Sequence, residues 1–476
     1  MRLDPIVRRC YWRGVRAAES TGSTLPPHAF AADGGTAFAE WLREPVVSGS
    51  PVSRILFELW QQRPDLQAAF PAPFGADGDS LVGWARADPG FAQAVPPALV
   101  PPPAGSTQLP GVNLVGYLAG EFGVASAARM VLRMLRTAGI PVAAMPVSAA
   151  SHRNSHRVSV STFGAPYDVS ILALNADGLL AYAQTPDFRA HSGRPRVGIW
   201  YWEVDVLPES MRPAFALVDE VWCASEHVRA ALEPWTEKPV RKHPLVFEAP
   251  HQPTHMHRGD LGLPDDRFLF GFVFDYASVP ARKNPLGLLE TYRQAFGPDD
   301  GATLVLKSIN ARHAPAAAEA VRRLAGDRRD IILIDAHLDV VEMRALFELL
   351  DCYVSLHRSE GLGLTLSAAM AAGTPVIATG WSGNVEFMTA DNSVLVPSSL
   401  EEVGPGSDPY PPEAVWASPD MDAAAKAMRR LFDRPDEARA LGLAGRSTIL
   451  REHAPELATP WLAERLTELT DRYVHA

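Results

Sequence analysis

A strand-like run, a glycine-rich turn and a helix-like segment follow one another between residues 352 and 373. Residues 352–356 are mostly apolar, Gly361 and Gly363 come next, and residues 364–372 are small and apolar up to a glycine and a proline that would end a helix. Glycine lets the backbone approach an anion closely, and the free N–H groups of a helix start point at it. This order predicts a phosphate cradle, although a tight connection without a ligand gives the same pattern.

The alternation of strand and helix extends through most of the chain from residue 111 onward. A segment rich in Pro and His at 244–253 interrupts it, and the alternation then restarts. Such a pattern predicts parallel sheets in two Rossmann-like halves, with ligands between the carboxyl ends of their strands. The expected strands cover 112–118, 168–174, 196–201, 220–224, 268–274, 303–307, 331–334 and 352–356. Helices are expected after most of them and from 421 to the C-terminus.

The first hundred residues differ from the rest. They contain aromatic-rich helical patches at 38–45 and 55–70, broken by Gly, Asp and Pro, and a proline-rich stretch follows at 95–110. The expected division is a helical accessory domain at 1–95, a linker at 96–110, one Rossmann-like half at 111–250, a second at 251–440, and C-terminal helices at 441–476 that cross back to the first half. The aromatic-rich first part is where we would expect a contact between copies of the chain.

Composition narrows the function classes. The 476 residues are 47% hydrophobic with a formal net charge of −11, which argues against nonspecific binding to nucleic acid. No apolar run reaches the roughly 18 residues of a membrane helix, and the N-terminus lacks the apolar core of a signal peptide, so we expect a cytoplasmic protein without an integral membrane segment. Cys10, Cys223 and Cys352 have no paired spacing, so we expect buried reduced thiols.

The stretch 357–388 resembles the donor-binding segment of family 4 retaining glycosyltransferases, which have the GT-B fold. The similarity lies in the Glu-Gly-Leu-Gly-Leu opening, the Ala-Met-Ala-Ala-Gly-Thr-Pro-Val-Ile-Ala-Thr body and the Gly-Asn-Val-Glu-Phe tail. The resemblance implies that the helix faces the donor diphosphate and that Glu360 bonds hydroxyls of the transferred sugar. A second Glu of that family, which bonds the ribose, is replaced here by Ala368. Nucleotide orientation must therefore come from elsewhere, or donor binding is weakened or lost.

A basic turn follows the first strand of the second half. Arg282, Lys283 and the Asn-Pro after them resemble the turn at the donor diphosphate in the same family, and Lys283 is the best single cation to neutralise the leaving phosphate. An additional Arg that many members carry after this strand has no match, and Asp275 stands nearby. Lys307 is a secondary candidate for binding the donor diphosphate. The alternative is that it is an ordinary lysine on the surface.

The first half carries two further segments with a resemblance. Residues 116–129 resemble the family's first-domain glycine loop: Gly123 and Arg129 match, whereas Ala125 and Ser126 replace a Gly and a Glu. A tight strand-to-helix turn is the alternative. Residues 198–208 resemble the Trp-x-Trp-Glu segment of related bacterial transferases, and imply an acceptor-side sugar site.

In that segment Trp200 and Trp202 offer faces on which a sugar ring can stack, and Glu203 can bond hydroxyls. Core packing of the two rings is the alternative.

These resemblances imply a metal-independent hexosyltransferase that acts with retention in bacterial polysaccharide biosynthesis. Its donor would be a UDP- or GDP-sugar, its acceptor a carbohydrate or glycan, and it would need no other cofactor. The expected catalytic residues are Lys283, Glu360 and Glu203. The expected donor-binding residues are Gly123, Arg282, Lys307, Gly361, Leu362, Gly363, Leu364, Gly383, Asn384 and Glu386. The expected acceptor-binding residues are Trp200, Trp202 and Arg129.

Two alternatives stay open, a degenerate GT-B protein that binds a sugar, nucleotide or partner, and a sugar-nucleotide hydrolase or epimerase. We expect no metal, because His and Asp groups elsewhere lack a third ligand or sit at a linker or helix start. These groups are His152 with His156, His251 with His255 and His257, and Asp420 with Asp422.

Overall fold

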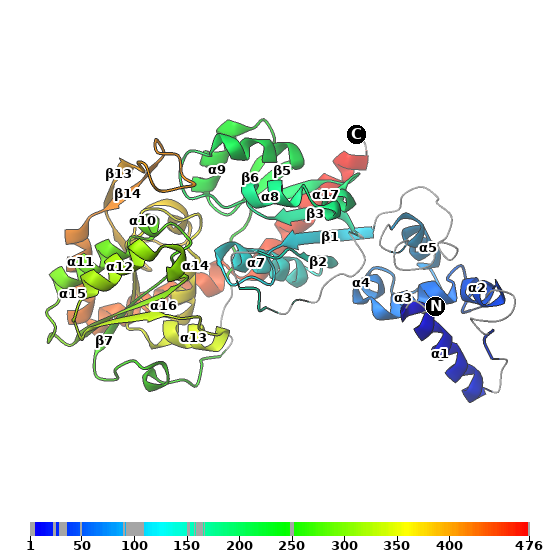
Figure 1. Ribbon diagram of the computed structural model, residues 1–476, viewed down its shortest axis with the longest axis horizontal. Helices are drawn as coiled ribbons and strands as arrows, with labels where there is room; N and C mark the ends of the chain where they lie inside the picture. The colour runs from blue at the N-terminus through cyan, green and yellow to red at the C-terminus, as the bar shows by residue number, and fades with distance from the viewer. Residues whose placement is uncertain are drawn as a thin grey trace.

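The computed structural model describes residues 5–21, 25–27, 36–47, 50–88, 91, 109–149, 153–156, 158, 165, 167–247 and 252–474. Figure 1 shows three parts in a row: a helical region at the N-terminal end, a first sheet with its helices in the middle, and a second sheet with its helices at the far end. The C-terminal helix returns from the far end to the middle part. His152 and His251 lie outside the described residues.

The N-terminal region consists of short helices around their own apolar core. They are α1 (Pro5–Thr21), α2 (Thr36–Arg43), α3 (Arg54–Gln62), α4 (Pro64–Ala69) and α5 (Gly78–Ala87). The Ser53 side chain caps α3, and Pro64 divides the expected patch at 55–70 into α3 and α4, because Pro favours the first turn of a helix and breaks its interior. Tyr167 of the first sheet belongs to the same core, so the helices pack on that sheet.

The first sheet has six parallel strands in the order β2-β1-β3-β4-β5-β6. They are β1 (Leu109–Gly116), β2 (Val142–Pro146), β3 (Tyr167–Ala173), β4 (Arg196–Ile199), β5 (Glu220–Cys223) and β6 (Val240–Lys242), and α7 (Gly123–Thr137), α8 (Ala176–Tyr182) and α9 (Glu226–Leu232) lie between them. The four strands expected here are confirmed. The expectation missed β2 and β6, which are short, and β1 begins inside the proline-rich stretch.

The second sheet is also parallel, in the order β12-β11-β10-β7-β8-β9. Its strands are β7 (Phe268–Asp275), β8 (Ala302–Ile309), β9 (Ile331–Asp335), β10 (Cys352–Ser355), β11 (Val376–Thr379) and β12 (Val394–Val396). The helices that accompany them are α10 (Pro280–Lys283), α11 (Pro285–Ala295), α12 (Pro315–Ala325), α13 (Val340–Leu349), α14 (Leu364–Ala372), α15 (Met421–Asp433) and α16 (Pro435–Glu452). The strand order reverses between β7 and β10, and a ligand site of such a sheet lies at that switch point.

A hairpin between β12 and α15 was not expected from the sequence. Strand β13 (Ser398–Glu402) pairs antiparallel with β14 (Val415–Pro419). Val403, Tyr410, Ala414 and Trp416 of this segment are buried in an apolar cluster whose other buried members come from the first half, among them Trp200 and Trp202. The hairpin therefore connects the second half to the core of the first.

The C-terminal helix α17 (Thr459–Val474) makes the opposite connection. It packs on α7 and β3, and its Trp461 ring lies edge-on to Trp222, with 4.7 Å between the ring centroids. Glu220, which is 1% exposed, accepts hydrogen bonds from Arg465 Nε at 2.8 Å and Trp222 Nε1 at 2.6 Å. This buried carboxylate ties α17 to β5.

Replacing Arg465 with Ala should lower the free energy of unfolding by about 3 kcal/mol, because Glu220 would stay buried without its main partner. Arg241 and Arg472 approach Glu220 only at 3.6 and 3.4 Å, from half-exposed positions, and would compensate little. Denaturant unfolding measures the loss. The double variant Glu220→Gln/Arg465→Met should lose clearly less; an equal loss in both would contradict the role of the charge pair.

Candidate functional site

Arg282, Lys283 and Glu360 lie close together at the switch point of the second sheet. Arg282 and Lys283 end α10 after β7, and Glu360 follows β10. Asn284 holds the two loops together, because its Nδ2 donates to the Leu356 carbonyl at 2.8 Å while its Oδ1 caps α11. Asn284 adopts a left-handed backbone (φ 54°), which Asn tolerates better than most residues.

Glu360 lies between the two cations. One carboxylate oxygen pairs with Lys283 Nζ, and the other lies 3.2 Å from Arg282 Nη1. Arg282 is 3% exposed and also donates to the Ser359 carbonyl at 2.8 Å. Its Nη2 faces Glu203 of the first half at 3.6 Å. We call Glu203, Arg282, Lys283 and Glu360 the charge cluster; it joins all three expected catalytic residues.

The charge cluster shifts the pKa of its members. Burial raises the pKa of Glu360, but Lys283 and Arg282 outweigh burial and hold that pKa at about 2. Burial and the neighbouring Arg282 lower the pKa of Lys283 below its ordinary value, with Glu360 opposing them. Glu360 is therefore a stable carboxylate at neutral pH, and Lys283 is a cation that loses its proton more readily than an exposed lysine.

The glycine turn after Glu360 has the form expected of a cradle. Gly363 has φ 90° and begins α14, and Gly383 N donates to the Glu360 carbonyl at 2.8 Å. A Cβ on Gly383 would lie 2.3 Å from the Gly361 carbonyl oxygen, so only glycine fits there. Asn384 is fully buried and bonds His357 and the Thr379 carbonyl, so its side chain holds the turn. Leu362 is buried in the core, whereas Leu364 is half-buried.

The two halves touch at this turn. Ser225 Oγ donates to the Gly361 carbonyl at 2.9 Å, and a Cβ on Gly361 would lie 3.3 Å from the Trp202 carbonyl oxygen. Glu386 bonds the Glu226 N–H and pairs with Lys242 Nζ at 2.8 Å, so its carboxylate faces the first half. The glycine turn after Glu360 and the Glu386 carboxylate therefore contact the first half directly in this structure.

Tyr410 is a residue of the site that the sequence did not indicate. Its hydroxyl donates to Glu203 Oε2 at 3.0 Å, and its ring lies edge-on to Trp202. The hairpin is fixed nearby as well, because the Val415 N–H donates to Asp205 Oδ1 at 2.8 Å. The strand and helix pattern gave no signal for this segment, and an aromatic residue between prolines was the only hint.

Both Trp rings expected to bind an acceptor are packed in the core. Trp200 is 1% exposed against Phe215, and Trp202 is 5% exposed with its Nε1 donating to the Val206 carbonyl. Neither ring has a face open to a sugar in this structure, because the hairpin and the first half cover them. The packing alternative describes them better than the stacking prediction.

The glycine loop of the first half is held by its own arginine. Arg129 Nη1 donates to the carbonyls of Leu118 and Gly120, and Nη2 donates to Ser126 Oγ. Its guanidinium therefore shapes the loop, which differs from the expected contact with an acceptor. Space is open around Gly123, and the Ala125 side chain is fully buried.

Lys307 lies apart from the charge cluster at the end of β8. It is 5% exposed, so the surface-lysine alternative is wrong, and burial lowers its pKa. Asp275, Asp335 and Glu121 act on it electrostatically; Glu121 belongs to the glycine loop of the first half and lies 3.3 Å from His337 Nδ1.

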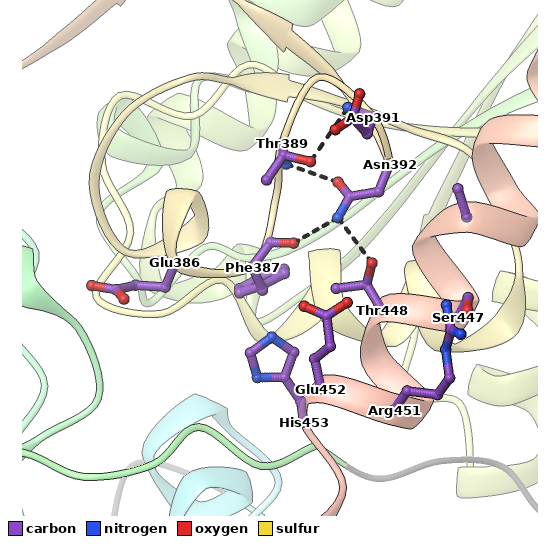
Figure 2. Close-up of a pocket in the computed structure, with 11 residues that line it drawn as sticks. Glu386, Phe387, Thr389, Asp391, Asn392, Ser447, Thr448, Arg451, Glu452 and His453 are labelled. Atoms are coloured by element: carbon purple, nitrogen blue, oxygen red, sulfur yellow. Dashed lines mark hydrogen bonds between the residues drawn. The ribbon is translucent and has the colours of Figure 1, made fainter.

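A pocket of about 460 Å³ lies between the turn after β11 and the end of α16 (Figure 2). Its wall includes Glu386, Asn392, Thr448 and His453, and Asn392 Nδ2 donates to Thr448 Oγ1 and to the Phe387 carbonyl. In Figure 2 Glu386 points away from the α16 side chains. The pocket shares Glu386 with the expected donor site, but the charge cluster does not line it.

Within the described residues, no three His, Cys, Asp or Glu side chains gather as metal ligands, and no helix is long and apolar enough to cross a bilayer. Asp420 caps α15 by accepting from the Ala423 N–H. The three cysteines are free and buried.

Comparison with known proteins agrees with this geometry. Residues 282–403 match the family model "Glycosyl transferases group 1", a span that begins at Arg282 and includes Glu360. Two solved structures resemble this chain over 76% of its length and 100% of theirs: Anabaena HepE in complex with UDP-glucose (TM-score 0.55, 13% identity) and sucrose-phosphate synthase from Thermosynechococcus elongatus (TM-score 0.53, 18% identity). The chain has the GT-B fold.

Another match is to S. aureus TarM in complex with Fondaparinux, α-GlcNAc-glycerol and UDP (TM-score 0.45, 14% identity), where 62% of this chain spans 54% of the TarM chain. No curated protein matches. The matched segment and the fold together support a glycosyltransferase.

The low pKa of Glu360 predicts a pH dependence of stability. A carboxyl whose pKa falls from 4.5 to about 2 on folding stabilises the fold above pH 4.5, by about 3 kcal/mol, and this contribution is lost as the pH falls from about 4.5 towards 2. The free energy of unfolding of Glu360→Gln should thus lie below that of the unchanged protein at pH 6, and the difference should shrink below pH 4.5. Glu290→Gln, at an exposed position, is the control. A difference that stays constant with pH would contradict the ion pair.

Proposed function

We propose that this chain is a retaining glycosyltransferase of the family 4 type that moves a hexose from a UDP- or GDP-sugar to a carbohydrate-containing acceptor without a metal. The observation that carries the proposal is the charge cluster at the switch point of the second half. It puts a carboxylate, Glu360, and two cations beside the glycine turn that opens α14. A nucleotide sugar needs these groups together, since it has hydroxyls at one end of the scissile bond and a diphosphate at the other.

In the proposed reaction, Lys283 and the N–H groups at the start of α14 stabilise the charge that develops on the leaving diphosphate. Glu360 accepts hydrogen bonds from hydroxyls of the transferred sugar. The acceptor hydroxyl enters on the side of the leaving phosphate, and a phosphate oxygen takes its proton. The chain then supplies position and charge, and no side chain forms a covalent intermediate.

Two contacts described above, Lys283 with Glu360 and Gly361 with Ser225, would have to open before a donor could bind. Lys283 is engaged by Glu360, and the Gly361 carbonyl is held by Ser225 of the first half. A donor would therefore have to separate the halves at this turn and draw Lys283 from Glu360 to its phosphate. Closing again over the bound donor would exclude water, which favours transfer over hydrolysis.

Ala368 supports a second candidate, a GT-B protein that binds a sugar or a partner without transferring. It lies half-buried on α14 and packs against the core, and its methyl group cannot accept a hydrogen bond from a ribose. A hydrolase or epimerase of sugar nucleotides is the remaining alternative. In either case the helical region at 1–95 would be an accessory part.

Replacing Lys283 with Met should weaken binding of UDP or GDP, whichever the protein binds, by about 10- to 100-fold, because one charge-assisted contact to phosphate is lost. Titration calorimetry with UDP, GDP, UDP-glucose and GDP-mannose measures this. Lys426→Met, at an exposed site on α15, removes the same charge and should change nothing. Absence of binding of all four ligands to the unchanged protein would sink the transferase proposal, and donor cleavage without transfer to any glycan would favour the hydrolase.

Ala368→Glu tests whether the missing ribose contact is a loss or a redesign. If the site is otherwise intact, a carboxylate at this position should raise nucleotide affinity about tenfold, as expected for one hydrogen bond to a charged group. The same calorimetry measures it, with Ala368→Gln as a control of similar size. Nucleotide affinity that is unchanged or lower in both variants would mean that the pocket has no room for a side chain larger than alanine at this position.

A further inference from the structure

Helix α1 has two faces of opposite character. At 100° per residue, Ile6, Val7, Cys10 and Ala18 fall on one side, and all four are buried. The other side carries Arg8, Arg9, Trp12, Arg13 and Arg16. Its arginines and its tryptophan are exposed, so this side faces solvent.

The arginines on the solvent side are mostly uncompensated. Arg13 pairs with Glu58 of α3 at 2.6 Å. Arg8, Arg9 and Arg16 have no acidic partner within the part of the chain that the structure describes. Helix α1 contains one acidic residue, Glu19, near its C-terminal end. In a chain with a net charge of −11, this is a local concentration of positive charge.

Trp12 stands among these arginines with 53% of its surface exposed. An exposed indole is typical of the boundary between water and lipid, which tryptophan favours. Arg8, Trp12 and Arg16 follow one another every four residues, so they form a single line along the helix.

We propose that this face of α1 docks the protein on an anionic membrane surface, with Arg8, Arg9 and Arg16 against lipid phosphates and Trp12 in the interfacial layer. A flat surface suits the position of α1, which lies in the helical region at one end of the molecule, with the second sheet at the other end (Figure 1). A long polyanion such as nucleic acid would meet the overall negative charge of the chain, whereas a membrane touches one face only. This inference does not depend on the proposed transfer.

Flotation of the full chain with lipid vesicles tests the proposal. Binding is expected to phosphatidylcholine vesicles that contain phosphatidylglycerol, not to phosphatidylcholine alone, and it should fall as salt is raised. The triple variant Arg8→Glu/Arg9→Glu/Arg16→Glu should bind at least tenfold more weakly, since each arginine near an anionic surface contributes about fivefold. Trp12→Ala should weaken binding while leaving the charge intact.

The matched control is Arg430→Glu/Arg434→Glu/Arg439→Glu, which makes the same change of net charge at exposed positions on α15, between α15 and α16, and on α16. It should keep vesicle binding close to that of the unchanged protein. Equal losses in both triple variants, binding to neutral vesicles, or no vesicle binding at low salt would each overturn the proposal. So would tight binding of a DNA duplex that depends on the same three arginines.

Circular dichroism and unfolding of the α1 triple variant should match those of the unchanged protein, because none of the three arginines has an acidic partner among the described residues. Its nucleotide binding by calorimetry should also be unchanged. A failure of membrane docking is therefore distinguishable from a failure of the proposed transferase function.

Discussion

The carboxylate of Glu360 between Lys283 and Arg282 is the interaction on which the site depends. An ionised carboxylate with 9% of its residue surface exposed is costly unless cations face it, and two cations do so here. The loops after β7 and β10 must therefore stay in register at the switch point of the second sheet. Asn284 adds a hydrogen bond to the Leu356 carbonyl, which ties the same two loops together.

The same cluster reaches across to the first half through Arg282 and Glu203. Glu203 is held from the other side by Tyr410, which comes from a hairpin of the second half that is buried in the core of the first. Helix α17 makes the return connection through Arg465 and Glu220. Each crossing thus combines a buried polar contact with apolar packing: Trp416 lies in the core of the first half, and Trp461 packs against Trp222.

Local sequence patterns predicted eight of the twelve strands in the two parallel sheets and the glycine turn, because strand, turn and helix follow from residues close in the chain. Glu360 and Lys283 were indicated by the resemblance to a family. Local patterns could not find Tyr410, which meets Glu203 across 207 positions of sequence. The same limit explains Trp200 and Trp202: a tryptophan at a strand end is open to a ligand or covered, and the covering hairpin lies far away in the sequence. Lys307 was taken as exposed in one alternative, yet it is 5% exposed.

The paired state of Lys283 bears on which ligand the proposed site can select. Inorganic phosphate would satisfy Lys283 but would take it from Glu360, leaving a buried carboxylate with Arg282 as its remaining close cation. A nucleotide sugar would bring phosphate oxygens to Lys283 and hydroxyls to Glu360 together, so both groups keep a partner. Because a buried carboxylate is less stable with one cation than with two, the ion pair penalises ligands that carry only the phosphate. Discrimination against bare phosphate would then follow from the same pairing that stabilises the unliganded protein.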